Sequence, residues 1–499
     1  MGIPSYYKKL CSTVNGLRSE CSKEIDWFFM DFNCLIYHCL HRMGVYDGSN
    51  DWESQFIECI VVYCRKVIQQ VAPKNGVYIA IDGVVPMAKM RQQRLRRFKS
   101  VWLKQNESAG GWDTNAITPG TVFMGKLRSR LEKMVEEHPT WKFSSSDEPG
   151  EGEHKIIAEW RKGIYKGNFA VYGLDADLIL LSMLGRICCS LDNIWLFREE
   201  VQAGKIAYDA KGEELFEWFS IHTLHNWLCA NQNATQFILH YCFAMSVLGN
   251  DFLPSSFSYK MRDDGHSALL SIIQEITQEG IIIIQPNTLD IMEDGLQILF
   301  KRLAVNDSER VLAYILKKQM FARNADQTEL GENNWPLAHV EENIFMEKSR
   351  LHPQWKDKYR QLLGRSIREI SDEYLQGIRW IWSYYTGKDV CYNWFYPFHL
   401  PPLWEWIDKL PVPTEILVRA SDIRPVEQLA LVLPLESWEL IPSSPEKQFP
   451  HLAPQFYPSV FSFDSMGKRF FWECESMIPF PSIIELKGII AAAATACAK

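Results

Sequence analysis

Two pairs of acidic residues stand close together in the middle of the chain. Glu151 and Glu153 lie in the run DEPGEGEHKI, and Asp175 and Asp177 lie in YGLDADLILL. Within each pair the spacing is i, i+2, so both carboxylates of a pair can serve one site. Two carboxylates about 4 Å apart repel each other by about 4 kcal/mol at an effective dielectric constant of about 20. The acids therefore either point apart into water or are held together by divalent cations. Ligation by oxygen alone favours Mg²⁺ or Mn²⁺ over zinc.

Three apolar runs that predict β-strands are each followed directly by an aspartate. They are Ile25–Met30 before Asp31, Val77–Ile81 before Asp82, and Phe169–Leu174 before Asp175. Helical patterns at Ser54–Val71 and Met90–Asn106 lie between these runs, and such alternation predicts a parallel sheet. Because the carboxyl ends of parallel strands meet at one edge, where open α/β sheets bind ligands, we expect the three aspartates to converge. One such aspartate alone would be an ordinary turn residue, whereas three indicate an active site.

A basic stretch begins only a few residues after Asp82. Within residues 86–104, three cations and an amide are spaced i, i+4, i+7 and i+8, on one face of a helix. They are Lys89, Gln93, Arg96 and Arg97. Guanidinium groups match phosphate oxygens, so this face predicts a phosphate-binding site. Taken alone, the stretch also fits a solvated basic helix or a localisation signal. Its closeness to Asp82 favours the phosphate site, and the two sites together indicate phosphodiester chemistry with two metal ions about 4 Å apart.

The length and composition of the whole chain limit its number of domains and its class of protein. Its 499 residues, 47% of them hydrophobic, can bury a large core in two or three domains. The net charge of −8 argues against a surface coated with nucleic-acid-binding charge but allows a local basic pocket. The 13 cysteines include no C-x₂-C pair, which is typical of reduced, intracellular proteins. Cys34, His38 and His41 fit buried helix residues better than zinc ligands. No apolar segment is long enough to cross a membrane.

The second half of the chain is mainly helical in pattern. A predicted helix at Ala234–Leu248 is followed by GNDFLP, which presents Asp251 in a loop. A strong helical pattern covers Glu369–Tyr385, and an aromatic-rich stretch, 392–406, follows it. Most of these aromatic residues, Trp394 among them, are core candidates. In a nucleic-acid enzyme, one or two of them could stack on bases.

These motifs, in this order, resemble the Xrn/Rat family of 5′→3′ exoribonucleases over nearly the whole chain. The first family block corresponds to residues 1–290, with MGIPSYYKKL, MDFNCLI, IDGVVPMAKMRQQRLRRFK, ITPGTVFM, DEPGEGEHKI, YGLDADLILL and GNDFLP. The second corresponds to 366–499, with YLQGIRWIWSYYTG, NWFYPFHLPP, EQLALVLP and MGKRFFWE, and a helical connection at 291–365 joins the two. The resemblance implies an α/β fold. Its mostly parallel central sheet is flanked by helices, as in PIN and flap-nuclease cores, and a second, mainly helical block packs on it.

The resemblance also assigns roles to residues of this chain. It implies seven carboxylates that are both catalytic and metal-binding, around Mg²⁺ or Mn²⁺, with two ions. By motif they are Asp31, Asp82, Glu151, Glu153, Asp175, Asp177 and Asp251. The pocket for the 5′-monophosphate of the substrate is assigned to Lys89, Gln93, Arg96 and Arg97. The first bases stack on Tyr37, where the family has a histidine, and on Trp394, with Tyr392 as the alternative to Trp394.

The function implied is processive removal of 5′-mononucleotides from single-stranded RNA that carries a 5′-monophosphate, in mRNA decay. We expect a monomer with no zinc and no membrane association, located in the cytoplasm, with the nucleus as the alternative. The zinc-knuckle pattern of nuclear members is absent, and so are the long C-terminal domains of cytoplasmic members. Two alternatives stay open: a flap-type endonuclease acting on DNA, and an inert RNA-binding scaffold. The residues themselves do not distinguish RNA from DNA, since contacts to the 2′-hydroxyl have no sequence motif.

Overall fold

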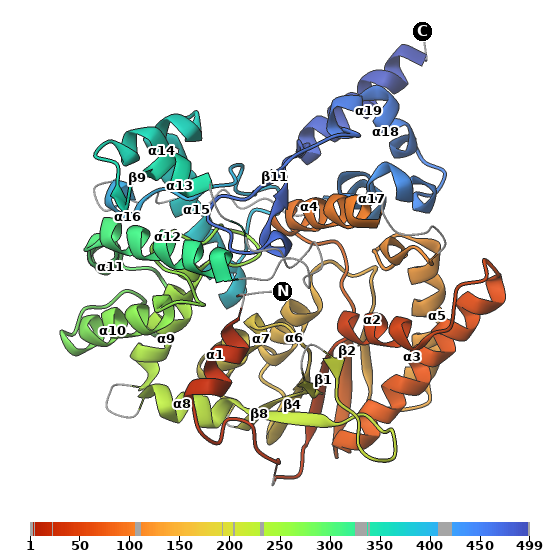
Figure 1. Cartoon of the computed structure of the whole chain (residues 1–499). Helices are drawn as coiled ribbons and strands as arrows, with labels where there is room; N and C mark the ends of the chain where they lie inside the picture. The colour runs from red at the N-terminus through yellow and green to blue at the C-terminus, as the bar shows by residue number, and fades with distance from the viewer. Residues whose placement is uncertain are drawn as a thin grey trace. The chain divides into compact units, whose positions relative to one another are not determined.

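The computed structural model describes residues 3, 5–21, 23–104, 111–191, 193–202, 205–229, 234–324, 337, 340–407 and 422–497. The chain forms two compact units, each assembled from segments that are distant in sequence (Figure 1). The sheet unit comprises Leu10–Ala230, Ser421–Tyr457 and Pro479–Lys499. The helical unit comprises Met1–Lys9, Asn231–Ala420 and Pro458–Ile478. The three-part division at 290 and 365 stays a prediction about sequence blocks.

A six-stranded sheet lies at the centre of the sheet unit, in the order β3-β2-β1-β4-β5-β8. The strands are β1 (Trp27–Asp31), β2 (Gly76–Ala80), β3 (Lys142–Ser144), β4 (Asn168–Tyr172), β5 (Asn193–Glu199) and β8 (Phe216–Ser220). All neighbours are parallel except β8, which pairs antiparallel with β5 at the edge. The predicted α/β class with a mostly parallel sheet is therefore confirmed. Between β5 and β8, the short strand β6 (Val201–Gln202) pairs antiparallel with β7 (Lys205–Ile206).

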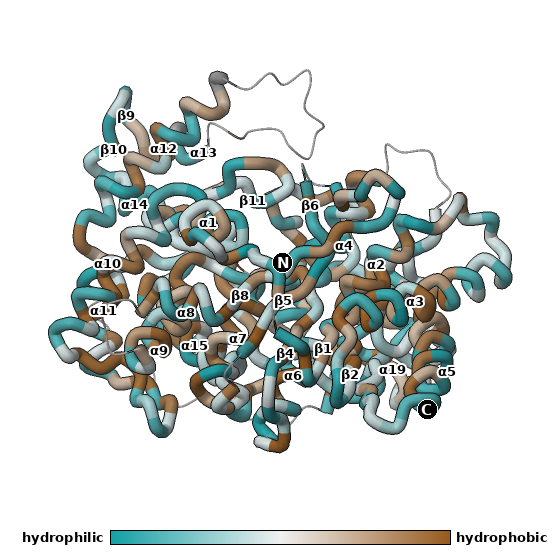
Figure 2. The backbone as a smooth tube through the Cα atoms, turned by 90° about the horizontal axis from the view of Figure 1, so that it is seen from below, coloured by the Kyte–Doolittle hydropathy of each residue, from teal (hydrophilic) through white to brown (hydrophobic). Residues whose placement is uncertain are grey.

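Helices cover both faces of this sheet. On one face, Phe28 and Met30 of β1 enter a core with α2 (Asn33–Arg42), α3 (Asn50–Val71) and α5 (Val122–Glu136). On the other face, Phe29 packs edge-on against Trp160 of α6 (Gly152–Trp160), with ring centroids 5.5 Å apart. Parallel strands that are buried on both faces need nearly continuous apolar sequence, which the run WFFM supplies. Brown and teal bands alternate along α3 and α5, as expected for helices with one buried face (Figure 2).

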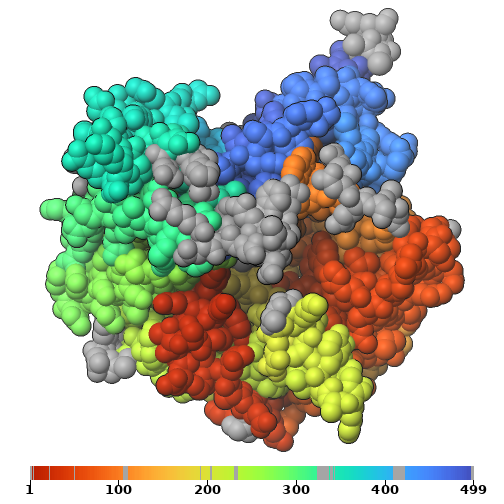
Figure 3. All heavy atoms as spheres, viewed as in Figure 1, coloured from red at the N-terminus to blue at the C-terminus, as the bar shows by residue number. Residues whose placement is uncertain are grey.

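The remaining elements of the sheet unit include the basic helix and three helices from the end of the chain. They are α4 (Met87–Lys104), α7 (Asp177–Cys188), α8 (Ile221–Cys229), α17 (Pro425–Val432), α18 (Phe449–Leu452) and α19 (Ile483–Cys497). Helix α4 lies against α17 (Figure 1). On the face drawn in Figure 3, α4 is visible only as a narrow orange strip. Half of the residues of α4 are buried, Gln93, Arg94 and Arg97 among them, so this predicted basic helix is largely buried rather than solvated.

The helical unit is built mainly from eight helices of the described residues. They are α9 (Ala234–Ala244), α10 (Gly265–Gln278), α11 (Glu293–Ala304), α12 (Asp307–Asn324), α13 (Val340–Phe345), α14 (Trp355–Leu363), α15 (Ile367–Thr386) and α16 (Trp404–Ile407). Two short strand pairs accompany them: β9 (Met346–Glu347) with β10 (Arg350–Leu351), and β11 (Phe463–Asp464) with β12 (Glu475–Ser476). Helix α1 (Tyr6–Thr13) contributes residues to both units. Among the described residues, every helix is too short or too polar to cross a membrane.

Candidate active site

The three strand-end aspartates lie together at one edge of the sheet. Asp31 is the last residue of β1, and Asp82 and Asp175 follow the ends of β2 and β4. Strand β1 pairs in parallel with both β2 and β4. Burial raises the pKa of Asp31 well above its ordinary value, and the negative charges of Asp82, Asp175 and Glu151 raise it further. Such mutual repulsion requires that these carboxylates be close neighbours. Their catalytic role stays a prediction.

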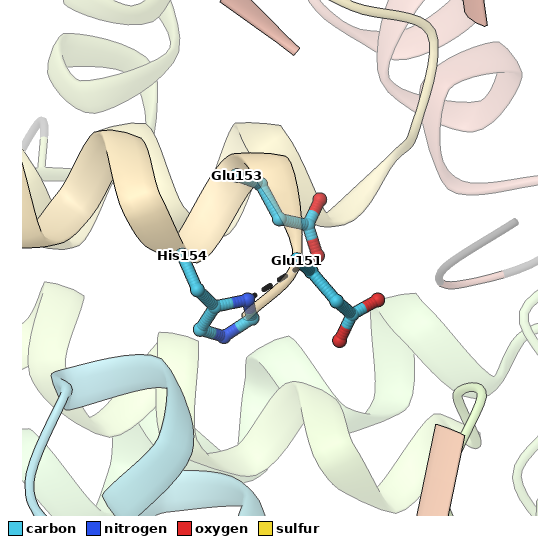
Figure 4. A group of neighbouring side chains, drawn as sticks. All are labelled: Glu151, Glu153 and His154. Atoms are coloured by element: carbon cyan, nitrogen blue, oxygen red, sulfur yellow. Dashed lines mark ion pairs between the residues drawn. The ribbon is translucent and has the colours of Figure 1, made fainter. Parts of the chain in front are cut away.

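Helix α6 brings the glutamate pair to the same edge. Glu151 is its N-cap residue and Glu153 lies in its first turn, and both side chains are buried (Figure 4). The residue between them must be glycine. A Cβ on Gly152 would lie 2.6 Å from Oδ1 of Asp31 and 2.9 Å from the carbonyl oxygen of Ala80. The glycine of DEPGEGEHKI therefore lets the helix approach the ends of β1 and β2 closely enough for its acids to join the strand-end aspartates.

Two overlapping groups of ligand atoms are spaced for metal binding. Glu153, Asp175 and Asp177 each offer one oxygen, and these atoms lie within 4.8 Å of one another. Glu151, Glu153 and His154 do the same with two oxygens and one nitrogen, and the dashed line in Figure 4 marks the 3.7 Å between Nδ1 of His154 and Oε1 of Glu153. Both groups contain Glu153, so its carboxylate would belong to either set of residues that could hold a cation. This mostly oxygen donor set fits Mg²⁺ or Mn²⁺.

The electrostatics of the cluster call for a cation. Burial and the charge of Glu151 raise the pKa of Asp82 to about 6. Burial, followed by the charges of Asp177 and Glu151, raises the pKa of Glu153 well above its usual range. Without a cation, these carboxyl groups therefore keep their protons to a higher pH than ordinary carboxyl groups do. A bound divalent cation opposes this effect, since it favours the ionised form of every carboxylate around it.

Groups of the protein already compensate part of this charge. Nζ of Lys89 lies 2.6 Å from Oε2 of Glu151. The backbone N–H of Gly152 donates to Oδ1 of Asp82 at 2.7 Å, and Nδ2 of Asn33 donates to Oδ2 of Asp82 at 2.8 Å. Gly152 opens α6, so the positive end of that helix faces the acids. Asn33 is the first residue of α2, and its role was missed because nothing in its sequence context marks it.

Lys155 is a second residue that sequence reasoning missed. Its buried Nζ donates to the carbonyl oxygens of Ile81 and Ser145, at 2.7 Å each. Ile81 immediately precedes Asp82, so Lys155 fixes the backbone that presents this acid. Burial lowers the pKa of Lys155 to about 8, although Asp82 and Glu148 favour the charged form. The motif DEPGEGEHKI contains Lys155, but spacing alone cannot show that its side chain turns inward.

The basic face of α4 begins at the acidic cluster. Lys89 contacts Glu151, as described above, and Gln93 and Arg97 are buried on the same helix, while Arg96 is exposed. Nη1 of Arg97 is buried and has no hydrogen-bond partner among the described residues. Burial lowers the pKa of Arg97 to about 10, so its guanidinium is charged at neutral pH, and Tyr37 lies close enough to favour that charge. A buried, charged donor without a partner fits an anion such as phosphate.

Asp251 and Trp394 belong to the helical unit. Asp251 follows the 3₁₀ helix Met245–Leu248 and is partly exposed. The side chain of Trp394 is only 8% exposed, its ring lies 5.3 Å from that of Trp380, and its indole N–H donates to Glu373 at 3.4 Å. These contacts are those of a packed core residue. The metal-binding role of Asp251 and the base-stacking roles of Tyr37 and Trp394 stay predictions.

Comparisons with known proteins give a consistent result. Residues 1–200 match the profile described as the XRN 5'-3' exonuclease N-terminus, and residues 355–495 match the Xrn1 helical domain. A 5'-3' exoribonuclease 1 of Schizosaccharomyces pombe is 24% identical over 96% of this chain and 48% of its own length. A 5'-3' exoribonuclease 2 of Arabidopsis thaliana is 24% identical over 99% of this chain and 67% of its own length. The 5'-3' exoribonuclease 1 of Homo sapiens is 25% identical over 96% of this chain and 33% of its own length. The chain thus spans between a third and two thirds of the length of these relatives.

Proposed function

The chain belongs to the XRN 5′-3′ exonuclease family, and from this premise we propose that it is a metal-dependent exoribonuclease acting on RNA with a 5′-monophosphate. It removes 5′-mononucleotides processively from single-stranded RNA and takes part in RNA decay. The named relatives are 5'-3' exoribonucleases, which supports the polarity and the RNA substrate. We propose that it acts as a monomer in the cytoplasm. The cysteines among the described residues are free thiols, which supports an intracellular location.

One observation carries this proposal: the ion pair between Lys89 and Glu151. It joins the basic face of α4 to the acidic cluster, with Nζ and Oε2 2.6 Å apart. Arg97, two helical turns further along α4, offers a buried donor without a partner among the described residues. A phosphate held by Arg97 therefore lies at a fixed distance along one rigid helix from the carboxylates. Helix α4 thus connects the proposed phosphate donor, Arg97, to the residue that contacts the acidic cluster, Lys89.

The carboxylates would hold the metal ions. Asp31, Asp82 and Glu151 face one another at the ends of β1, β2 and the loop before α6, and Glu153 with Asp175 and Asp177 provides a second set of oxygens. Divalent cations bound there supply the stabilisation of charge on the phosphoryl group and the activation of water. The side chains that surround the acids set their positions: Asn33 and the N–H of Gly152 each hold one oxygen of Asp82.

The residues of α4 would select the substrate. Arg97 binds the terminal phosphate with a charge-assisted hydrogen bond, and a 5′-hydroxyl end offers no such partner. The burial of Gln93 and Arg97 leaves little room, so a bulky capped end is rejected by size. Lys89 lies between this phosphate and the carboxylates, where it can neutralise charge on the phosphodiester as the bond breaks.

The test is an RNA decay assay with three matched substrates: 5′-phosphate, 5′-hydroxyl and capped RNA, each with and without Mg²⁺ or Mn²⁺. We expect degradation of the 5′-phosphate RNA alone, only with metal, and with mononucleotides as the labelled product from the first time point. Products several nucleotides long from an internally labelled substrate would instead support a flap-type endonuclease. Binding without any decay would support the inert scaffold.

A further inference from the structure

Helix α4 is held by hydrogen bonds to residues that lie more than 330 positions further along the chain. Arg94 follows Gln93 in this helix, and its side chain is fully buried at 0% exposed. Its Nη1 donates to the carbonyl oxygen of Leu431 at 2.8 Å, its Nε donates to that of Pro479 at 3.2 Å, and its Nη2 donates to that of Phe456. All three acceptors belong to the sheet unit.

The environment of Arg94 explains why these carbonyls are needed. A buried guanidinium must satisfy its N–H groups, and backbone carbonyls do so without neutralising its charge. The guanidinium also lies over the rings of Phe98 and Tyr457, with centroids 4.5 and 5.0 Å away. Leu431 is in the last turn of α17, where carbonyl oxygens have no partner within the helix and a cation is favourable. Arg94 thus caps α17 with a charge on α4.

The segment before α4 is held by the same C-terminal helix. The backbone N–H of Val85 donates to Oε1 of Gln428 in α17 at 3.0 Å, and Gln428 is fully buried. Val85 lies in the short link between Asp82 and the start of α4 at Met87. On its other side this link is tied to the loop before Glu151 by two backbone hydrogen bonds, Gly83 N–H to Gly150 O and Gly150 N–H to Val84 O.

We propose that Arg94 and Gln428 are positioning residues for the choice of the 5′ end, and that α17 sets where the phosphate-binding face of α4 stands relative to the acidic cluster. The inference rests on the proposed function, because it assumes that Arg97 binds the 5′-phosphate. Neither Arg94 nor Gln428 touches the substrate in this account. They act by holding α4 and the link before it against α17, so that Arg97 meets the phosphate at the correct distance from the carboxylates.

A displacement of α4 should therefore change the kinetic constants for RNA with a 5′-phosphate in particular. A displacement of α4 by about 1 Å weakens the contact with the terminal phosphate, and misplacements of this size can reduce catalytic efficiency by about 100-fold. RNA with a 5′-hydroxyl makes no such contact, so its KM is not affected. Asp31, Glu153 and Asp175 are positioned by β1, by α6 and by the loop after β4 rather than by α4, so KM is expected to change more than kcat. Lys89 moves with α4, and its effect on kcat is shared by both RNAs.

The experiment compares KM and kcat for 5′-phosphate and 5′-hydroxyl RNA, with Mg²⁺, in Arg94→Met, Arg94→Lys and Gln428→Met. We expect Arg94→Met to raise KM for 5′-phosphate RNA by about 10- to 100-fold and to leave KM for 5′-hydroxyl RNA unchanged. Arg94→Lys keeps the charge and some of the donors, so it should recover part of the loss. Gln428→Met should act in the same direction as Arg94→Met. Lys104→Met, an exposed cation in the last turn of the same helix, is the control and should leave both constants unchanged.

Arg97→Ala, measured in parallel, separates the two proposals. If Arg97→Ala leaves the preference for 5′-phosphate unchanged, the proposed phosphate pocket is wrong, and the inference falls with it. If Arg97→Ala removes the preference while folded Arg94 and Gln428 variants keep it, or lose affinity for both RNAs equally, the positioning role alone is overturned. Near-ultraviolet circular dichroism checks the fold of each variant. Should Arg94→Met fail to fold, Arg94→Lys and Gln428→Met decide by the same criterion.

Discussion

Replacing Asp82 with asparagine should stabilise the metal-free protein while abolishing its response to metal. Burial and the charge of Glu151 raise the pKa of Asp82 to about 6, whereas the ordinary pKa of an aspartate, which applies in the unfolded chain, is 3.8. A carboxyl group whose pKa is higher in the folded state binds its proton more tightly there. The native state therefore loses stability as the pH rises from about 4 through about 6, and at pH 7 the whole penalty is present.

The size of the stabilisation by Asp82→Asn follows from the pKa shift of Asp82. A shift of about two units at 1.36 kcal/mol each gives about 3 kcal/mol of destabilisation at pH 7, which asparagine removes. Asparagine keeps only one oxygen, so it loses one of the two hydrogen bonds from Asn33 and Gly152, and this costs about 1 kcal/mol. The net gain is about 2 kcal/mol, which raises the melting temperature of a unit of this size by about 4 °C.

The assay is thermal unfolding at pH 7 in a chelator and again in excess Mg²⁺ or Mn²⁺. We expect the variant to melt above the wild type in the chelator and to gain little from metal, whereas the wild type gains markedly. Glu159→Gln, in α6, is the matched control, because this substitution should change the stability in the opposite direction. Burial raises the pKa of Glu159, but hydrogen bonds from Lys162, Tyr165 and Lys142 outweigh it and lower that pKa to about 2. Its removal should destabilise the protein. A metal-free Asp82→Asn protein that melts lower than the wild type would refute the reasoning.

Three further outcomes are expected. Metal affinity can be measured by calorimetry between pH 5 and pH 8, which is about the range in which proteins are most stable. It should fall as the pH drops through about 6, because Asp82 must lose its proton to bind a cation. An affinity that does not change with pH would contradict the raised pKa of Asp82. Asp175→Asn should abolish turnover while sparing RNA binding, as judged by decay and filter-binding assays, and wild-type turnover would contradict its assignment. Arg96→Ala combined with Arg97→Ala should narrow the preference for 5′-phosphate over 5′-hydroxyl RNA; if competition between the two RNAs is unchanged, the pocket lies elsewhere.

The sequence was informative where the chemistry is local. Apolar runs followed by aspartate predicted β1, β2 and β4, because a parallel strand that is buried on both faces needs a nearly continuous apolar sequence. The i, i+4, i+7, i+8 spacing predicted the basic helix, and its start close to Asp82 made a shared site the natural expectation. Strand β3, with only three residues, and β5 offered no comparable ending and were not predicted.

What the sequence could not show are the contacts that depend on how distant segments meet. Lys155 and Arg94 each look like solvent-exposed cations of a helix, yet both are buried with backbone carbonyls as partners. The motif EQLALVLP, which forms most of α17, gives no indication that its residue Gln428 holds the link after Asp82. Such partners are hundreds of residues away, and neither periodicity nor spacing encodes them.

The fastening of α4 by residues 428 to 479 also has a consequence for how the protein is made. While a ribosome is still translating the middle of the message, Arg94 has none of its three carbonyl acceptors, and a guanidinium without them is poorly tolerated in an apolar interior. The basic helix therefore lacks these contacts until residues 428–479 have emerged. A chain that stops before residue 428 is therefore expected to lack the ordered basic face of α4.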